Sequence, residues 1–336
     1  MRRLLALLIS AILLRVYPCE LCAIYNAGNV AGQSERGFLF TLSEQYIPYN
    51  QPYFDGREVR LSNPSFLDSS ITHVVPGYNF SSRFGVSLNV PVTYLSFRRT
   101  DIRYSTTAPP VVYTERGHEF GIGDVALIGR ATVFEANSMH YGLVLNLLGG
   151  VKFPTGDTHR IDEEVEQSRV FQSLLPPNTP HDPLSHSIAS VHQHQLALGS
   201  GSYDGIFGLS FNSRYERYFL NGQFQYYLRT RGEAGFTFAD EIIVTGGPGA
   251  FLFLEKSWTL SVQANATYDS MGRDELLGRA TSRTGYTEWF IGPNFNFSCG
   301  NHFNANAGVD LPLYVLNHGF QSMPEYQVRA GITLRF

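Results

Sequence analysis

The chain has 336 residues, of which 16% are charged and 14% are aromatic, and its formal net charge is -4 at pH 7. Soluble domains carry about 25% charged residues, so this composition is unusual for one. The negative net charge and the lack of a basic patch argue against a nucleic-acid partner. No run of about 18 apolar residues follows the N-terminal stretch, which argues against a helical membrane protein.

The first residues predict an exported chain. The stretch MRRLLALLISAILL places two arginines before an apolar run that Arg15 ends, which is typical of a secretory signal and too short for a spanning helix. We expect the signal peptide to cover residues 1–18 and to extend to 27 at most, since cleavage before Cys19 and cleavage around Ala23 are both acceptable. Residues 19–36 would then form a periplasmic segment ahead of the folded domain.

The chain has three cysteines, Cys19, Cys22 and Cys299. Cys19 and Cys22 form a C-x-x-C motif, whose spacing suits a redox pair, half of a metal site or a haem attachment. Haem attachment requires a histidine after the second cysteine, and Ala23 stands there. The alternatives are an exported disulfide between Cys19 and Cys22, or loss of both with the signal peptide.

From residue 37 onward, apolar and polar residues alternate in segment after segment. Period-two alternation predicts β-strands with one apolar and one polar face. In the segment 218–230, for example, Leu220 and Phe224 share a face opposite to Asn221 and Gln223. The twelve predicted strands are 37–46, 71–80, 83–97, 120–134, 139–153, 191–215, 218–230, 239–254, 257–269, 284–297, 302–315 and 325–336.

The connections between these strands alternate between long and short along the whole chain. Long polar loops are predicted at 98–117 and 154–189, for example, and tight turns at 81–82 and 255–256. Loops of unequal length on the two sides are typical of an outer-membrane barrel, with short periplasmic turns and long extracellular loops, whereas a soluble sandwich has no reason to alternate. We therefore predict an all-β fold, a transmembrane antiparallel β-barrel over 37–336 whose apolar faces contact outer-membrane lipids.

The last predicted strand ends on an aromatic residue of its apolar face. It resembles the assembly signal of bacterial outer-membrane barrels, which implies a barrel-assembly machinery as partner. The residues that carry this signal are Tyr326, Ile332, Leu334 and Phe336.

The polar faces would then face a water-filled lumen, where inward charges tune a pore or fill it with ion pairs. The predicted lumen-lining residues are Asp124, Arg130, Lys152, Asn221, Gln223, Gln225, Arg229, Gln263, Asn265, Asn304, Asn306, Asp310, Arg329 and Arg335.

Few residues suggest chemistry beyond passage. His192 and His194 would share one face of a strand, and histidines with carboxylates can bind zinc or copper. The adjacent loop lacks a compact ligand spacing, so we expect neither metal nor cofactor. His186 and Ser187 are adjacent on a predicted loop, without the positioned base that a serine nucleophile needs. We therefore expect no catalytic residues.

Five motifs resemble a bacterial family, the outer-membrane "transporter" or phenol-degradation meta-pathway proteins. The resemblance implies a barrel that helps small, often hydrophobic or aromatic, compounds to cross the outer membrane, without catalytic residues. The Cys19–Cys22 pair does not belong to the family pattern. The matching motifs are PGYN at 76–79, FGVSLNVP at 84–91, GDVAL at 123–127, GVKFPTGD at 150–157 and LGSGSYD at 198–204.

Together these features predict a Gram-negative outer-membrane channel for passive passage of small, hydrophobic or aromatic solutes, constricted by the loop at 154–189. Two alternatives stay open. One is a barrel scaffold whose periplasmic C-x-x-C motif docks a redox or metal partner, and the other is an outer-membrane hydrolase.

Overall fold

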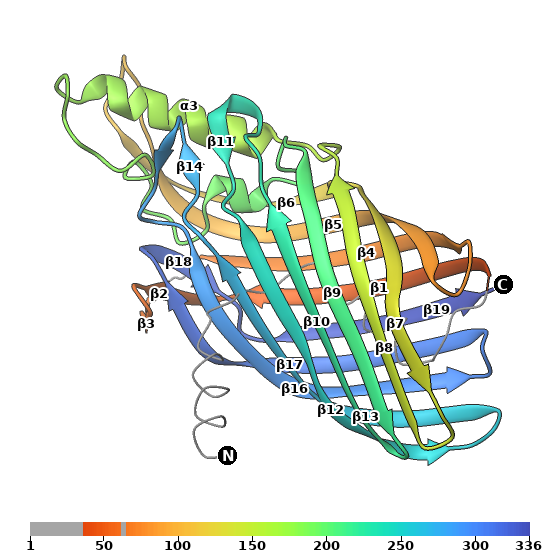
Figure 1. Cartoon of the computed structure of the whole chain (residues 1–336). Coiled ribbons are helices and arrows are strands. Elements are labelled where there is room, and N and C mark those ends of the chain that lie inside the picture. Colours follow the sequence, from red (N-terminus) through yellow and green to blue (C-terminus); the bar gives the residue numbers. More distant parts are fainter. Residues whose placement is uncertain (1–35, 62–64) are drawn as a thin grey trace, which may run out of the picture.

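The computed structural model describes residues 36–61 and 65–336, in which a large antiparallel sheet closes on itself into a barrel (Figure 1). The ring has twelve strand positions, because β6 and β7 succeed each other along β5 and share one. Pairing of β1 with β19 closes it. The barrel strands are β1 (Gly37–Tyr49), β4 (Phe66–Asn79), β5 (Phe84–Arg103), β6 (Val111–Ile122), β7 (Ala126–Asn137), β8 (Tyr141–Lys152), β9 (Asp204–Tyr215), β10 (Tyr218–Leu228), β12 (Glu241–Leu254), β13 (Trp258–Met271), β16 (Tyr286–Cys299), β17 (Phe303–Asn317) and β19 (Gln327–Arg335).

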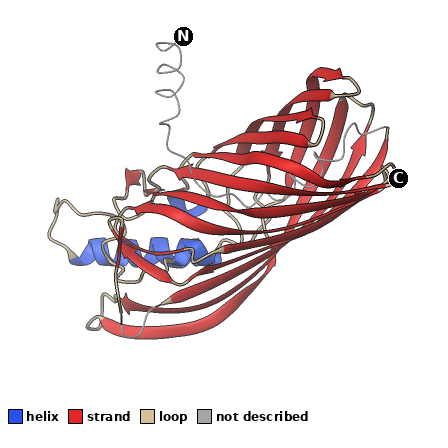
Figure 2. Cartoon of the chain, turned by 90° about the horizontal axis from the view of Figure 1, so that it is seen from below, coloured by secondary structure: helices blue, strands red, loops and turns tan. Residues whose placement is uncertain are grey.

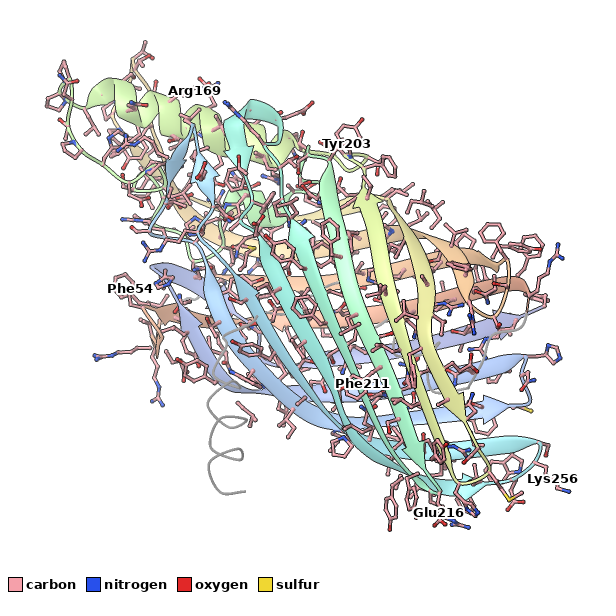
Figure 3. The ribbon with its side chains drawn as sticks, viewed as in Figure 1. Phe54, Arg169, Tyr203, Phe211, Glu216 and Lys256 are labelled. Carbon is pink, nitrogen blue, oxygen red and sulfur yellow. The ribbon has the colours of Figure 1, made fainter. Side chains whose placement is uncertain are left out.

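The apolar face of each strand points outward. In β1, Phe38 is 65% exposed whereas Thr41 and Gln45, on the opposite face, are 4% and 2% exposed. The same arrangement recurs around the ring, and Phe211 of β9 lies on the outer wall in Figure 3. A barrel with an apolar exterior and a polar interior matches a lipid environment rather than water. The predicted fold class is therefore confirmed.

Several predicted boundaries are wrong. The strand expected at 120–134 is divided between β6, which ends at Ile122, and β7, which begins at Ala126. Residues 98–117 were expected to form a loop, but β5 continues to Arg103 and β6 begins at Val111, so the hairpin rises above the rest of the sheet. The strand expected from 191 begins at Asp204. The expected loop at 154–189 contains the helix α3 (His159–Leu174). Its sixteen residues lack glycine and proline, which favours a helix.

The two ends of the barrel differ. Both Gly37 and Phe336 lie at the end with the short turns, where Figure 3 also places Glu216 and Lys256. The opposite end carries the long connections and two small sheets. These consist of β2 (Gln51–Phe54), β3 (Arg57–Glu58) and β18 (Phe320–Met323), and of β11 (Phe236–Thr237), β14 (Glu275–Leu276) and β15 (Arg279–Ala280), with η1 (Gln193–Leu196) and η2 (Glu233–Gly235) nearby.

The connection between β8 and β9, residues 153–203, forms a structure that we call the cap. It contains α3 and η1 and lies at the long-loop end of the barrel, as Figure 2 shows from a second direction. None of the described helices is long and apolar enough to cross a membrane. The cap and the small sheet of β11, β14 and β15 share an apolar core. This core consists of Ile161, Val165, Leu184, Phe236 and Leu276.

Candidate functional site

Two cavities occupy the barrel interior. The mouth cavity, of about 470 Å³, is lined at the short-turn end by residues such as Arg130, Trp258 and Arg335. The cap cavity, of about 270 Å³, lies at the other end, and the cap residues His194 and Leu198 form part of its wall. A solute that crosses the barrel would pass through both.

An apolar cluster, which we call the waist cluster, lies between the cavities. Val75 and Ile128 line the mouth cavity, whereas Ala126 and Tyr227 line the cap cavity. These residues point inward, against the rule that the lumen is polar, and sequence analysis did not identify them. The waist cluster comprises Val75, Ala126, Ile128, Ile206, Tyr227 and Ile243, each at most 2% exposed.

Polar side chains fill the interior beside the waist cluster. Asn221 and Gln263 exchange two hydrogen bonds, in which the amide of Asn221 donates at 3.3 Å and that of Gln263 donates at 2.5 Å. Arg329 forms a buried ion pair with Asp310. These cross-strand contacts pair polar groups that would otherwise be desolvated without partners.

The residues predicted to line the lumen lie on the inner side of the wall in three places. Arg130 and Arg335 line the mouth cavity. Asp124, Lys152 and Arg229 line the cap cavity. The remaining nine are buried in the interior: Asn221, Gln223, Gln225, Gln263, Asn265, Asn304, Asn306, Asp310 and Arg329. Their part in solute passage stays a prediction.

Two cations of the cap cavity are held by carboxylates. The Nζ atom of Lys152 lies 2.8 Å from both Asp124 and Asp204. Arg229 contacts Asp204 at 3.1 Å and Glu241 at 2.5 Å. Lys152 and Arg229 are therefore both engaged on the same side of the cavity.

Ion pairs tie the cap to the hairpin of β5 and β6. From α3, Arg160 reaches Glu119 at 2.5 Å and Glu115 at 2.8 Å. From β5, Arg99 pairs with Asp101 and donates a hydrogen bond to the backbone of the cap residue Val191. The hairpin, which sequence analysis took for a loop, thus serves as the support of the cap.

A second set of charges lies inside the cap. The Nδ1 atom of His194 lies 2.6 Å from Glu164 of α3, and that of His192 lies 3.7 Å from the other oxygen of Glu164. Burial opposes the charge of Glu164, but His194 and His192 outweigh it and lower the pKa of Glu164. Burial likewise opposes the charge of His194, yet Glu164 raises the pKa of His194. Burial lowers the pKa of His192 to about 4 and raises the pKa of Asp274, 3.9 Å from His194.

The expected placement of His192 and His194 on one strand face is wrong. They lie at the start of the short helix η1, where their rings stack with centroids 5.4 Å apart. Within the described ranges, no three His, Cys, Asp or Glu side chains are arranged to hold a metal ion. The pair therefore has a structural partner in Glu164, which sequence spacing did not indicate.

The hydrolase alternative finds no support in the geometry at His186 and Ser187. The hydroxyl of Ser187 donates to Asp101 at 3.0 Å. The Nδ1 atom of His186 lies 3.0 Å from the carbonyl oxygen of Pro183. Ser187 thus bonds to a carboxylate and His186 to a backbone carbonyl, whereas a serine nucleophile needs a hydrogen bond to a base.

The other predicted residues lie along β19, at the two ends of the barrel or outside the described ranges. At the short-turn end, Cys299 is exposed and forms no disulfide with a described residue, and Phe336 is 74% exposed at the seam beside β1. Tyr326 precedes β19, and Ile332 and Leu334 belong to it. The signal peptide and the Cys19–Cys22 pair lie outside the described residues.

Comparison with solved structures identifies the architecture. The chain is similar to the COG4313 outer membrane channel from Pseudomonas putida F1, with a TM-score of 0.58 and 13% identity over 92% of this chain and 98% of that one. The fold is that of an outer-membrane β-barrel. Weaker likenesses are to the β domain of the Bordetella autotransporter BrkA (TM-score 0.42, 10% identity, 90% and 100% covered) and to the P. putida toluene transporter TodX (0.37, 8%, 92% and 92%). No family model and no curated protein matches the chain.

The expected likeness to outer-membrane transporter barrels is thereby confirmed in fold. The apolar exterior places the barrel in a membrane, and the outer-membrane location predicted from the sequence fits this fold.

Proposed function

We propose that the chain is an outer-membrane channel through which small, hydrophobic or aromatic solutes pass passively. The observation that carries this function is the waist cluster, which joins two cavities inside a closed barrel. Apolar side chains at a constriction resist water and ions, because wetting such a passage is unfavourable. A solute with an apolar ring replaces water there at lower cost.

The cavities support the same preference. Phe219, Phe251 and Trp258 line the mouth cavity, and Tyr49, Leu67 and Phe238 line the cap cavity. Sites for small organic molecules combine apolar surface with placed polar groups, and residues of both kinds line the two cavities.

The cap supplies the outer restriction. Sequence analysis expected the loop at 154–189 to fold inward, but α3 lies at the long-loop end of the barrel (Figure 1), and it is residues between 194 and 200 that line part of the cap cavity. Two contacts fix this arrangement. The Nε atom of Arg160 donates a hydrogen bond to Glu119, and the carboxylate of Glu164 is hydrogen-bonded to Nδ1 of His194. We infer that movement of the cap admits solutes from outside.

We propose that the chain performs no catalysis and needs no cofactor or energy source. The engagement of Ser187 with Asp101 supports this statement against a hydrolase. Mass spectrometry of the mature protein tests the scaffold alternative, because a chain that begins after Cys22 cannot dock a partner through that motif.

Liposome swelling tests the channel directly. Proteoliposomes would be challenged with sugars, amino acids and single-ring aromatic compounds of similar size, with heat-denatured protein as the control. We expect aromatic compounds to enter faster than sugars. Equal rates for all classes would contradict the role of the waist cluster, and no swelling at all would contradict the channel.

A further inference from the structure

One inward carboxyl of the cap cavity has no hydrogen-bond partner among the described residues. Glu288 of β16 is fully buried and lines the cap cavity, and within residues 36–61 and 65–336 neither of its carboxylate oxygens makes a hydrogen bond. A buried ionised group without compensation is strongly unfavourable, so such a carboxyl either takes up a proton or binds a cation.

A second carboxyl lies next to Glu288. Asp269 of β13 is its direct partner in the antiparallel register, and it is also fully buried on the inner face. Residues directly opposite each other have Cβ atoms about 5 Å apart, where two negative charges repel. The neighbouring carboxyl of Asp269 therefore adds to the negative potential at Glu288.

The cations of the cap cavity are already engaged elsewhere. Lys152 contacts Asp124 and Asp204, and Arg229 contacts Asp204 and Glu241. Their charge is therefore shared among three other acids. Among the described residues, no recorded ion pair brings a positive group to Glu288.

Aromatic and apolar side chains line the cap cavity together with Glu288 and other polar residues. Tyr49, Tyr286, Met271 and Met323 line the same cavity. Tyrosine rings attract organic cations through their faces, and methionine adapts to rings of varied shape. A cavity of about 270 Å³ suits a ligand smaller than a drug-sized one.

We propose that the cap cavity binds the ammonium group of a small aromatic amine, with Glu288 as its anionic contact and with Asp269, opposite Glu288 on β13, adding to the negative potential. The inference rests on the proposed function, since it names a class of solute that the channel selects. The amine supplies the charge that Glu288 lacks, while its ring packs against the tyrosines and methionines.

Isothermal titration of the purified full-length barrel in detergent tests the site. The probes are benzylamine, which is cationic, and benzyl alcohol, which is its neutral counterpart of nearly equal size. We expect benzylamine to bind at least about tenfold more tightly than benzyl alcohol, in line with one charge-assisted contact. Equal affinities in the unmodified protein would overturn the proposal without any variant.

Two variants localise the effect. Glu288→Gln keeps the shape and removes the charge, and we expect it to weaken benzylamine binding about tenfold while benzyl alcohol is unaffected. Glu255→Gln, at the mouth cavity, is the matched control and should leave both affinities unchanged. Asp269→Asn serves as a second variant if Glu288→Gln does not fold, as judged by heat-dependent migration in gels.

Two further outcomes separate the possibilities. Displacement of benzylamine by millimolar Ca²⁺, together with Ca²⁺ binding that depends on Glu288, would identify an inorganic-cation site and overturn the amine assignment. Benzylamine binding through Glu288 without any solute flux into liposomes would leave the site intact and refute the channel.

Discussion

Val75 of β4 and Ile243 of β12 belong to one buried apolar cluster, although their strands lie six positions apart in a ring of twelve, on opposite sides of the barrel. Side chains from facing walls therefore approach each other across the interior. At this level apolar side chains meet inside the barrel. We therefore expect the waist cluster to be the barrier to ions.

Truncation of the waist cluster should open the channel to ions. We expect the double variant Val75→Ala and Ile243→Ala to raise single-channel conductance in planar bilayers at least about twofold, because the constriction becomes wider and easier to wet. The matched control is Val74→Ala with Val244→Ala, which shortens the outward-facing neighbours. A conductance unchanged in the inner variant would show that the barrier lies elsewhere.

The ion pairs of Arg160 should hold the cap in place. Arg160→Met leaves Glu119 and Glu115 without their cation, and we expect a loss of roughly 1–3 kcal/mol in local cap stability, since the group is largely but not fully buried. Hydrogen exchange of α3 measures this. Arg169→Met, an exposed change on the same helix, should have little effect. Equal protection in both variants would argue against an anchoring role for Arg160.

Removal of the cap helix should increase passage. Deletion of 159–186 removes Glu164, which accepts hydrogen bonds from His194, and so releases residues 194–200 from their support. We expect higher single-channel conductance in planar bilayers. If the deleted protein folds and conducts like the parent, the cap does not restrict the channel.

Acidification should loosen the cap through His192. Burial lowers the pKa of His192 from 6.5 to about 4, so the unfolded cap binds the proton more readily than the folded cap between these values. The free energy of cap unfolding is therefore highest above pH 6.5 and falls as the pH decreases toward 4, by about 3 kcal/mol for the full shift. The pKa of Glu164 is lowered, so protonation of Glu164 reduces the free energy of cap unfolding further at still lower pH.

Other groups around His192 modify this dependence. Because the pKa of His194 is raised, this residue stabilises the folded cap. Its contribution to the free energy of cap unfolding is complete below pH 6.5 and is lost as the pH rises through the raised pKa. Arg99 and Asp101 act on His192 in opposite directions. Hydrogen exchange of α3 at pH 7.5, 6 and 5, corrected for intrinsic rates, measures the sum. His192→Gln should reduce the change, and a wild-type cap equally protected at all three values would refute the prediction.

The lipid-facing part of the fold was predictable because lipid imposes a strict pattern. Phe38 and Leu42 alternate with Thr41 and Gln45 in the sequence as they do across the wall. The pattern disappears where the sheet leaves the lipid. Arg99 and Asp101 of β5 point inward but are polar, as is Arg98 beside them, so the segment resembled a loop. No local rule distinguishes a polar strand above the membrane from a polar loop.

The interior could be predicted only in part. Polar residues such as Asn221 and Gln263 were placed on the inner face because alternation fixes both faces at once. The waist cluster escaped detection because Val75 follows Val74, and two adjacent valines hide which one faces inward. The burial of Glu164 depends on His194, thirty residues away, and a run of acids normally indicates solvent exposure.

The seam of the barrel has a consequence for biogenesis. Thr41 of β1 and Thr333 of β19 are joined by a hydrogen bond across 292 positions of sequence. The cylinder cannot be sealed until β19 has met β1, and contacts so distant in sequence form slowly. Until that moment the intermediate carries two open strand edges and an oily outer surface, and it depends on protection from self-association.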